Sequence, residues 1–186
     1  ITNLPEGHEQ MLSMANHPKN EAMGRRDVPF TRDLFIDQTD FEEVAPAGFK
    51  RLIPGGEVRL RGCYVMRCDS VEKNSEGKVV QLNCSIDPDT LGKNPEGRKV
   101  KGVIHWVSAD RGIPVTTRLY DRLFTVEDPG SKDYDDYREN LNPDSLIELS
   151  QSVVEPAAVS SESAGRYQFE REGYFCLDSA EKASGQ

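Results

Sequence analysis

Long hydrophobic runs are missing from this chain of 186 residues. No segment reaches the roughly 20 consecutive apolar residues that a membrane-spanning helix needs, and the first residues lack the basic-then-apolar pattern of a secretory signal. The composition is polar, with 36% hydrophobic and 30% charged residues, yet the apolar residues gather in short runs that can build a core. We therefore expect a globular, cytoplasmic protein that does not contact a membrane.

Cysteine is scarce, and its spacing excludes the common metal and redox motifs. The four cysteines form no Cys-x-x-Cys pair and have no Cys/His spacing suited to zinc. Since each stands in an apolar, strand-like context, we expect reduced and mostly buried thiols. His105, between Ile104 and Trp106, is expected to be a packed structural histidine rather than a catalytic one. The cysteines are Cys63, Cys68, Cys84 and Cys176.

Catalytic motifs are also missing. The chain has no Walker-type phosphate loop, no dinucleotide-binding glycine fingerprint, no HExxH zinc motif and no GxSxG nucleophile turn. The acidic pair Asp135 and Asp136 has no neighbouring histidine, and a solvated loop is its ordinary interpretation. We expect no catalytic residue, no metal site and no cofactor within this chain.

Charge is present in quantity but is unevenly distributed. The net charge of -9 ordinarily argues against a nucleic-acid partner, because phosphates bind to clustered lysine and arginine. Residues 47–67 nevertheless carry a local balance of +4 and residues 91–102 one of +3, whereas residues 127–148 carry -6. Such segregation indicates one face for an anion and another facing water, although a pair of solvated loops explains the charges equally well.

Short apolar runs separated by turn residues predict an all-β fold of the barrel or sandwich kind. The clearest hairpin joins two strands through the loop at residues 74–77. We expect strands over residues 28–36, 57–73, 78–86, 101–107, 115–123, 145–154 and 166–177.

Helical signals are few. Thr39 and Glu42 have the spacing of a capping box, which predicts a short helix over residues 41–44. Residues 134–140 can form a second short helix within the acidic segment. Residues 155–165, rich in Ala, Ser and Glu, are expected to form a mobile loop.

Two arginines in one predicted strand indicate an anion-binding face. The two-residue period of a strand sends Val58 and Leu60 toward the core and places Arg59 and Arg61 on the same outer face, about 7 Å apart. Guanidinium groups suit phosphates and the edges of unstacked bases, and RNA that is read by sequence is usually single-stranded. Two exposed arginines that form salt bridges at the rim of a sheet are the ordinary alternative.

Four segments resemble the anticodon-binding region of bacterial glutaminyl-tRNA synthetases, which are class I aminoacyl-tRNA synthetases. The resemblance runs nearly end to end and implies two β-barrels of the ribosomal-protein type, with one or two short helices. The proximal barrel would use residues 1–45 and 130–186, and the distal barrel residues 46–129. The segments are MANHPKNEAMGRRDVPF at residues 14–30, FKRL with GGEVRLRGCYVMR within residues 49–67, GRKVKGVIHWVSADRGIPVTTRLYDRLF at residues 97–124, and YQFEREGYFCLDS at residues 167–179.

The resemblance also implies roles for the first group of basic residues. In the glutaminyl enzymes, the matching Lys-Arg pair and the matching Arg-x-Arg strand contact anticodon bases and adjacent phosphates. These roles carry over to Lys50, Arg51, Arg59 and Arg61, of which Arg51 and Arg61 are the expected base readers. Gly48 departs from the family pattern, in which a glutamine precedes the Lys-Arg pair by two residues.

A second group of contacts is implied near the two ends of the chain. Gln168 matches the family glutamine that contacts the middle anticodon base, a uracil, and Arg171 matches a nearby basic contact. Asn16, Lys19 and Asn20 fall in the segment that supplies additional tRNA contacts, and which of them takes the family role stays open.

The implied partner is the anticodon loop of the glutamine tRNA. A catalytic domain of the same polypeptide would use ATP and Mg²⁺ for glutaminylation, since the HIGH-like and KMSKS-like motifs of class I synthetases do not occur in this chain. We expect a monomer. A glutamyl-tRNA synthetase or a ribosomal RNA-binding β-barrel is the nearer alternative. A small-molecule-binding β-barrel, recognisable by a deep apolar cavity, is the more distant one.

Overall fold

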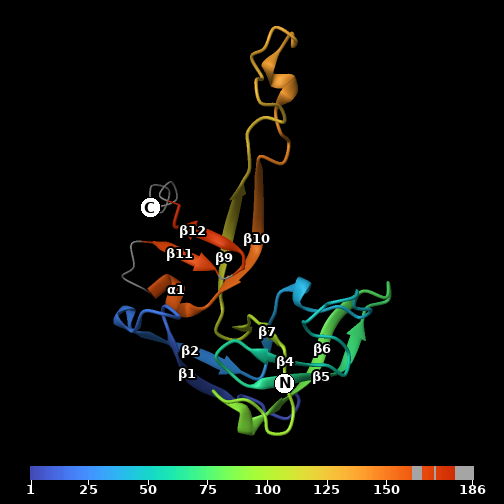
Figure 1. Cartoon of the computed structure of the whole chain (residues 1–186), viewed down its shortest axis with the longest axis vertical. Helices are drawn as coiled ribbons and strands as arrows, with labels where there is room; N and C mark the ends of the chain where they lie inside the picture. The colour runs from blue at the N-terminus through green and yellow to red at the C-terminus, as the bar shows by residue number, and fades with distance from the viewer. Residues whose placement is uncertain (161–164, 170, 179–186) are drawn as a thin grey trace. The chain divides into compact units, whose positions relative to one another are not determined.

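The computed structural model of the chain consists mostly of β-strands, which confirms the all-β class (Figure 1). The structure describes residues 1–160, 165–169 and 171–178. The strands are β1 (Glu9–Ala15), β2 (Arg25–Thr31), β3 (Leu34–Phe35), β4 (Glu57–Leu60), β5 (Val65–Lys73), β6 (Val79–Asp87), β7 (Gly102–Ile104), β8 (Val107–Ser108), β9 (Ile113–Tyr120), β10 (Leu146–Val154), β11 (Arg166–Phe169) and β12 (Gly173–Cys176).

Contacts divide the chain into two compact units. Unit 1 comprises residues 1–112 and 155–186, and unit 2 comprises residues 113–154. Unit 1 holds a sheet of order β6-β5-β4-β7 and the pairs β1-β2, β3-β8 and β11-β12, whereas unit 2 is the antiparallel pair β9-β10. The closure of these sheets into a proximal and a distal barrel stays a prediction.

The hydrophobic core of unit 1 forms around three aromatic rings. Phe30 is fully buried, and its ring centroid lies 5.4 Å from that of Tyr64 and 5.4 Å from that of Trp106. Aromatic contacts at such distances add to the stabilisation from burial. Val58 and Leu60 of β4 are also fully buried, which confirms the inward face predicted for this strand.

The predicted strand over residues 57–73 is wrong, because the chain reverses within it. β4 ends at Leu60, and β5 begins at Val65 and returns antiparallel to β4. Gly62 has a φ of 66°, a conformation that side chains other than glycine rarely adopt, and the Cys63 amide donates to the Leu60 carbonyl at 2.9 Å. Arg61 therefore lies in a turn and not on the outer face of a strand beside Arg59. The β5–β6 hairpin, by contrast, forms as predicted.

Three other predicted strands are also divided. The strand over residues 101–107 stops at Ile104, and Val107 belongs to β8, which pairs with β3. The strand over residues 28–36 breaks between β2 and β3, where the Thr31 hydroxyl donates to the Asp33 carbonyl at 2.8 Å. The strand over residues 166–177 is the hairpin β11–β12, closed by a hydrogen bond from the Glu172 amide to the Phe169 carbonyl at 3.0 Å.

Helical structure in the described residues is limited to short segments. The capping-box helix over residues 41–44 is wrong: Asp37, not Thr39, caps a 3-10 turn that ends at Asp40, and Phe41 is already extended. Of the predicted loop over 155–165, the first part is helical, and residues 161–164 lie outside the described residues. The helical segments are η1 (Glu21–Met23), η2 (Gln38–Asp40), η3 (Pro88–Thr90), η4 (Tyr137–Asn140) and α1 (Pro156–Ser160).

The cysteines are free thiols and three of the four are buried, as predicted. Cys176 is the exposed one. Burial raises the pKa of the Cys63 and Cys84 thiols to about 12. Among the described helices, none has the length and apolar character required to cross a membrane.

Candidate nucleic-acid interface

Two of the predicted arginines meet at one buried carboxylate. Arg171 forms a bidentate pair with Asp40, in which Nη1 donates to Oδ1 and Nη2 to Oδ2, both at 2.7 Å. Arg51 Nε lies 3.2 Å from Asp40 Oδ1, and the Asp40 side chain is fully buried. A buried charge is costly unless it is paired and hydrogen-bonded, and here both oxygens of the carboxylate have guanidinium partners.

Local backbone contacts fix the position of Asp40. The Asp37 side chain caps η2, and the Asp40 amide donates to the Asp37 carbonyl at 3.0 Å. The Leu52 amide then donates to the Asp40 carbonyl at 2.9 Å, and Arg51 Nη1 donates to the Thr39 carbonyl at 2.9 Å. The segment that bears Arg51 is thus held alongside the turn that bears Asp40.

Arg171 enters the same site from the β11–β12 turn. Its φ of 75° makes it the non-glycine residue with positive φ among the described residues. This left-handed conformation costs roughly 1–2 kcal/mol for an ordinary side chain. The bidentate bonds to Asp40 offset that cost and raise the pKa of the Arg171 guanidinium.

Arg61 and His105 lie in the electrostatic neighbourhood of this pair. Burial lowers the pKa of the His105 imidazole, and Arg171 and then Arg61 lower it further, whereas the carboxylates of Asp40 and Glu155 act in the opposite direction. His105 is half-buried, which agrees with the prediction of a packed structural histidine. Arg51 and Arg171 therefore meet at Asp40, and both Arg61 and Arg171 act electrostatically on His105.

Backbone hydrogen bonds hold the turn that bears Arg61. The Arg61 amide donates to the Ile104 carbonyl at 2.9 Å, and Trp106 Nε1 donates to the Arg61 carbonyl at 3.0 Å. The residue itself is exposed. The turn is therefore anchored to the aromatic core, while the Arg61 side chain is exposed.

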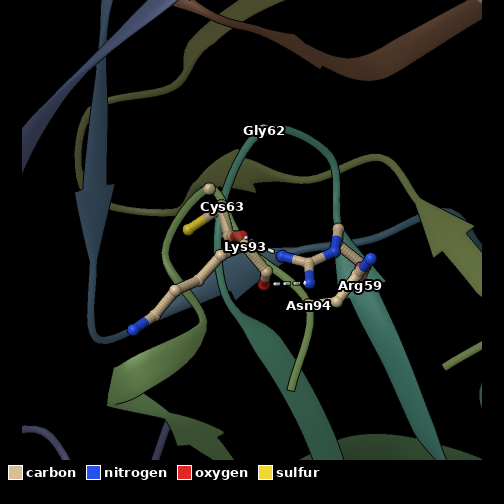
Figure 2. Close-up of a pocket in the computed structure, with 6 residues that line it drawn as sticks. Arg59, Gly62, Cys63, Lys93 and Asn94 are labelled. Carbon is tan, nitrogen blue, oxygen red and sulfur yellow. Dashed lines mark hydrogen bonds between the residues drawn. The ribbon is translucent and has the colours of Figure 1, made fainter. Parts of the chain in front are cut away.

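Arg59 has a different environment from the other predicted arginines. Its Nη1 donates to the carbonyls of Cys63 and Thr90, both at 2.9 Å, and its Nη2 donates to the Lys93 carbonyl at 2.5 Å. Figure 2 shows the guanidinium between the Cys63 turn and the Lys93 segment, with the Lys93 side chain directed away from it. These bonds hold the Arg59 side chain in the wall of a pocket of about 280 Å³. Asn94 also lines this pocket.

Lys50 and Gln168 are exposed and lie close in sequence to Arg51 and Arg171, respectively. Gln168 lies in β11, opposite Tyr174, and precedes the turn that carries Arg171. The Lys50 carbonyl packs against Gly102 of β7 so closely that a Cβ at Gly102 would lie 2.2 Å from it. The position of the Lys50 backbone therefore depends on a glycine in the neighbouring strand.

The three predicted contacts near the N-terminus form one small loop. Asn16 Nδ2 donates to the Met23 carbonyl at 2.9 Å, and Asn20 caps η1 by accepting a hydrogen bond from the Ala22 amide at 3.1 Å. The Lys19 side chain is exposed. The two asparagine side chains thus shape the loop that presents Lys19.

Asp40 was missed by the sequence reasoning. The S/T-x-x-E spacing drew attention to Thr39 and Glu42, whereas Asp40, the first of the two residues between them, is the buried anion of the site. The one available signal was an aspartate close in sequence to Arg51 and directly before the apolar Phe41.

Comparison with known proteins covers the whole chain. Residues 1–87 and residues 103–178 match two family models, both described as tRNA synthetases class I (E and Q), anti-codon binding domain. The chain is 54% identical to the glutamine–tRNA ligase of Pseudomonas aeruginosa over 187 aligned residues, 100% of this chain and 34% of that protein. It is 52% identical to that of Stutzerimonas stutzeri, covering 100% and 33%, and 54% identical to that of Aliivibrio salmonicida, covering 96% and 32%.

The chain spans about a third of the length of the curated relatives it matches. It belongs to the anticodon-binding domains of the class I (E and Q) tRNA synthetases, in the form found in glutamine–tRNA ligases.

Proposed function

We propose that this chain binds the anticodon loop of the glutamine tRNA through the surface formed by Lys50, Arg51, Arg61, Gln168 and Arg171, hereafter the arginine surface. The observation that carries the proposal is the meeting of Arg51 and Arg171, distant in sequence, at one buried carboxylate. Each guanidinium has five N–H donors, so the contacts with Asp40 leave donors on both arginines for an RNA ligand.

The chemistry of the arginine surface suits a single-stranded loop. Fixed guanidinium forks can donate hydrogen bonds to a phosphate or to the edge of an unstacked base, and the exposed amide of Gln168 can both donate and accept hydrogen bonds. RNA loops are the usual targets of sequence-specific recognition because their bases can turn outward. Arg59, Asn16, Lys19 and Asn20 stay predicted contacts.

The remainder of the proposal concerns the longer protein. The relatives are glutamine–tRNA ligases, and we propose that a catalytic domain in the same polypeptide uses ATP, with Mg²⁺, to charge the bound tRNA. A cytoplasmic monomer and the division into a proximal and a distal barrel belong to the same proposal.

A binding measurement tests the function directly. The chain is titrated with an anticodon stem-loop carrying CUG and with one carrying an unrelated anticodon, as wild type and as Arg61→Ala, at two salt concentrations. A base contact is worth about 1–3 kcal/mol, so Arg61→Ala should weaken CUG binding by roughly tenfold. The control is Arg138→Ala, which removes an exposed arginine paired with Asp136 in unit 2.

The outcomes separate the competing functions. A preference for CUG that falls in Arg61→Ala and persists in Arg138→Ala supports anticodon reading. Salt-dependent binding without a preference between the two anticodons would indicate that the chain binds only the phosphates of the RNA. This result is expected for the ribosomal RNA-binding alternative. The absence of binding at both salt concentrations would contradict an RNA partner.

A further inference from the structure

The side chain of Asp40 contacts both Arg51 and Arg171. Arg171 occupies both of its carboxylate oxygens, and Arg51 shares Oδ1. The Arg171 side chain is 29% exposed and the Arg51 side chain 37% exposed, whereas Asp40 is fully buried beneath them. An RNA ligand on this surface would therefore contact the arginines and not the aspartate.

A buried ion pair of this kind is a poor device for stability alone. The desolvation of the charges cancels much of their attraction, and well-packed apolar side chains often stabilise a protein equally well. What the pair supplies is geometry, because a bidentate contact fixes the plane of a guanidinium. The left-handed backbone at Arg171 is a local strain of the kind that clusters at ligand-binding and active sites.

A second argument concerns the entropy of binding. A free arginine side chain has many rotamers, and ordering it on a ligand costs affinity. Arg171 and Arg51 are already ordered by Asp40, and Arg51 is also held by the Thr39 carbonyl. When one arginine is removed, the other can use the carboxylate oxygens of Asp40 that both had shared. The positions of the two side chains are therefore coupled.

On the basis of the function proposed above, we infer that Asp40 is a positioning residue that couples Arg51 and Arg171, so that recognition through one arginine depends on the presence of the other. The coupling is carried by a shared carboxylate and requires no movement of the backbone. It predicts that discrimination between anticodons, and not only affinity, depends on a side chain that never contacts the RNA.

The first test replaces the charge and keeps the shape. Asp40→Asn retains one acceptor oxygen but cannot hold two guanidinium groups as a carboxylate does. We expect the preference for the CUG stem-loop over single-base variants of its anticodon to fall by roughly tenfold, the size of one lost base contact. The salt dependence should change little, because both arginines keep their charge.

The matched control is Asp69→Asn. Asp69 also pairs with an arginine, Arg67, at 2.7 Å, but on the exposed part of β5. It should leave the preference unchanged. A purely structural role for Asp40 would lower the fraction of active protein and leave the discrimination of the folded fraction unaltered, an outcome that would overturn the inference.

The second test does not require a stable Asp40 variant. Arg51→Ala, Arg171→Ala and the double variant form a cycle in the presence of the native aspartate. We expect the double variant to lose less affinity for the CUG stem-loop than the product of the two single losses. Losses that multiply independently would contradict the coupling, because separate sites have additive free energies. If the wild-type chain shows no anticodon preference, the proposed function itself fails.

Discussion

Unit 1 and unit 2 differ in what they bury and in the charge they carry. The buried hydrophobic residues of the described chain, from Leu12 to Trp106, all belong to unit 1. In unit 2 the large apolar side chains are partly exposed, among them Leu146 at 45% and Leu149 at 43%. The basic segments at 47–67 and 91–102 lie in unit 1, and the acidic segment at 127–148 lies in unit 2.

This difference separates a unit with a hydrophobic core from a unit without buried hydrophobic residues among the described part of the chain. A two-stranded hairpin is marginally stable in water on its own, whereas unit 1 has several sheets and an aromatic core. The candidate interface is built on the unit with the core, which suits side chains that must be held in fixed geometry. The net charge of -9 hides this arrangement because a total for the whole chain does not show that the basic residues gather in two short segments.

The largest expected effect contrasts one leucine in each unit. Leu60→Ala removes a fully buried side chain and should cost about 2–5 kcal/mol of the free energy of unfolding, because a cavity remains. Leu149→Ala, at a partly exposed position in unit 2, should cost less than about 1 kcal/mol. Urea denaturation followed by circular dichroism measures both, and equal losses would show that unit 2 has a core of its own.

A pair of glycines gives the next largest contrast. A Cβ at Gly102 would lie 2.2 Å from the Lys50 carbonyl, so Gly102→Ala should destabilise the chain by about 1–3 kcal/mol through overpacking. It should also weaken stem-loop binding, since Lys50 and Arg51 would be displaced. In unit 2, the nearest atom to a Cβ at Gly130 is Asp128 Oδ1, at 3.8 Å. Gly130→Ala should therefore be close to neutral, and a comparable loss at both sites would refute the close-packing argument.

Acidification should affect unit 1 through His105. Burial and two arginines lower its pKa below the ordinary value of 6.5, so the unfolded chain binds more protons as the pH falls through that value. Stability is therefore lost as the pH decreases through the ordinary histidine value of 6.5 toward the lower pKa of the folded state. Calorimetric Tm values at several pH values measure this loss, and it should be smaller in His105→Asn. An unchanged acid sensitivity in that variant would assign the effect to other groups.

The smallest expected effect is in unit 2. Arg118 and Glu148 face each other across β9 and β10, with Nε and Oε1 2.7 Å apart. Since the pair is partly exposed, Glu148→Gln should change the free energy of unfolding by less than about 1 kcal/mol, and the change should shrink at high salt. A salt-insensitive loss of several kcal/mol would indicate a buried contact instead.

The features that sequence reasoning predicted correctly depend on local chemistry. The β5–β6 hairpin is closed by Asn74, whose Oδ1 accepts from the Glu76 and Lys78 amides, and such a turn is readable from four residues. The inward face of β4 follows from a period of two. The basic residues of the site were found through resemblance, and the structure joins two of them, Arg51 and Arg171, at Asp40.

The features that were missed depend on distant partners or on a single residue. The burial of Asp40 follows from a partner 131 residues away, for which an amphipathic pattern contains no signal. The division of the strand over 57–73 follows from one left-handed glycine, Gly62, in an otherwise strand-like segment. Arg59 was expected on an outer face, but its side chain turns to carbonyl groups of the 90–93 segment that become neighbours only after folding.

The single tryptophan gives the site its own spectroscopic signal. Trp106 is buried, and its indole N–H donates to the carbonyl of Arg61, at the base of the turn that bears a predicted base reader. Indole emission responds to changes in the polarity and hydrogen bonding of its surroundings. A ligand that shifts this turn therefore changes the intrinsic fluorescence of the protein, and unlabelled RNA can be titrated by following the emission of one known residue.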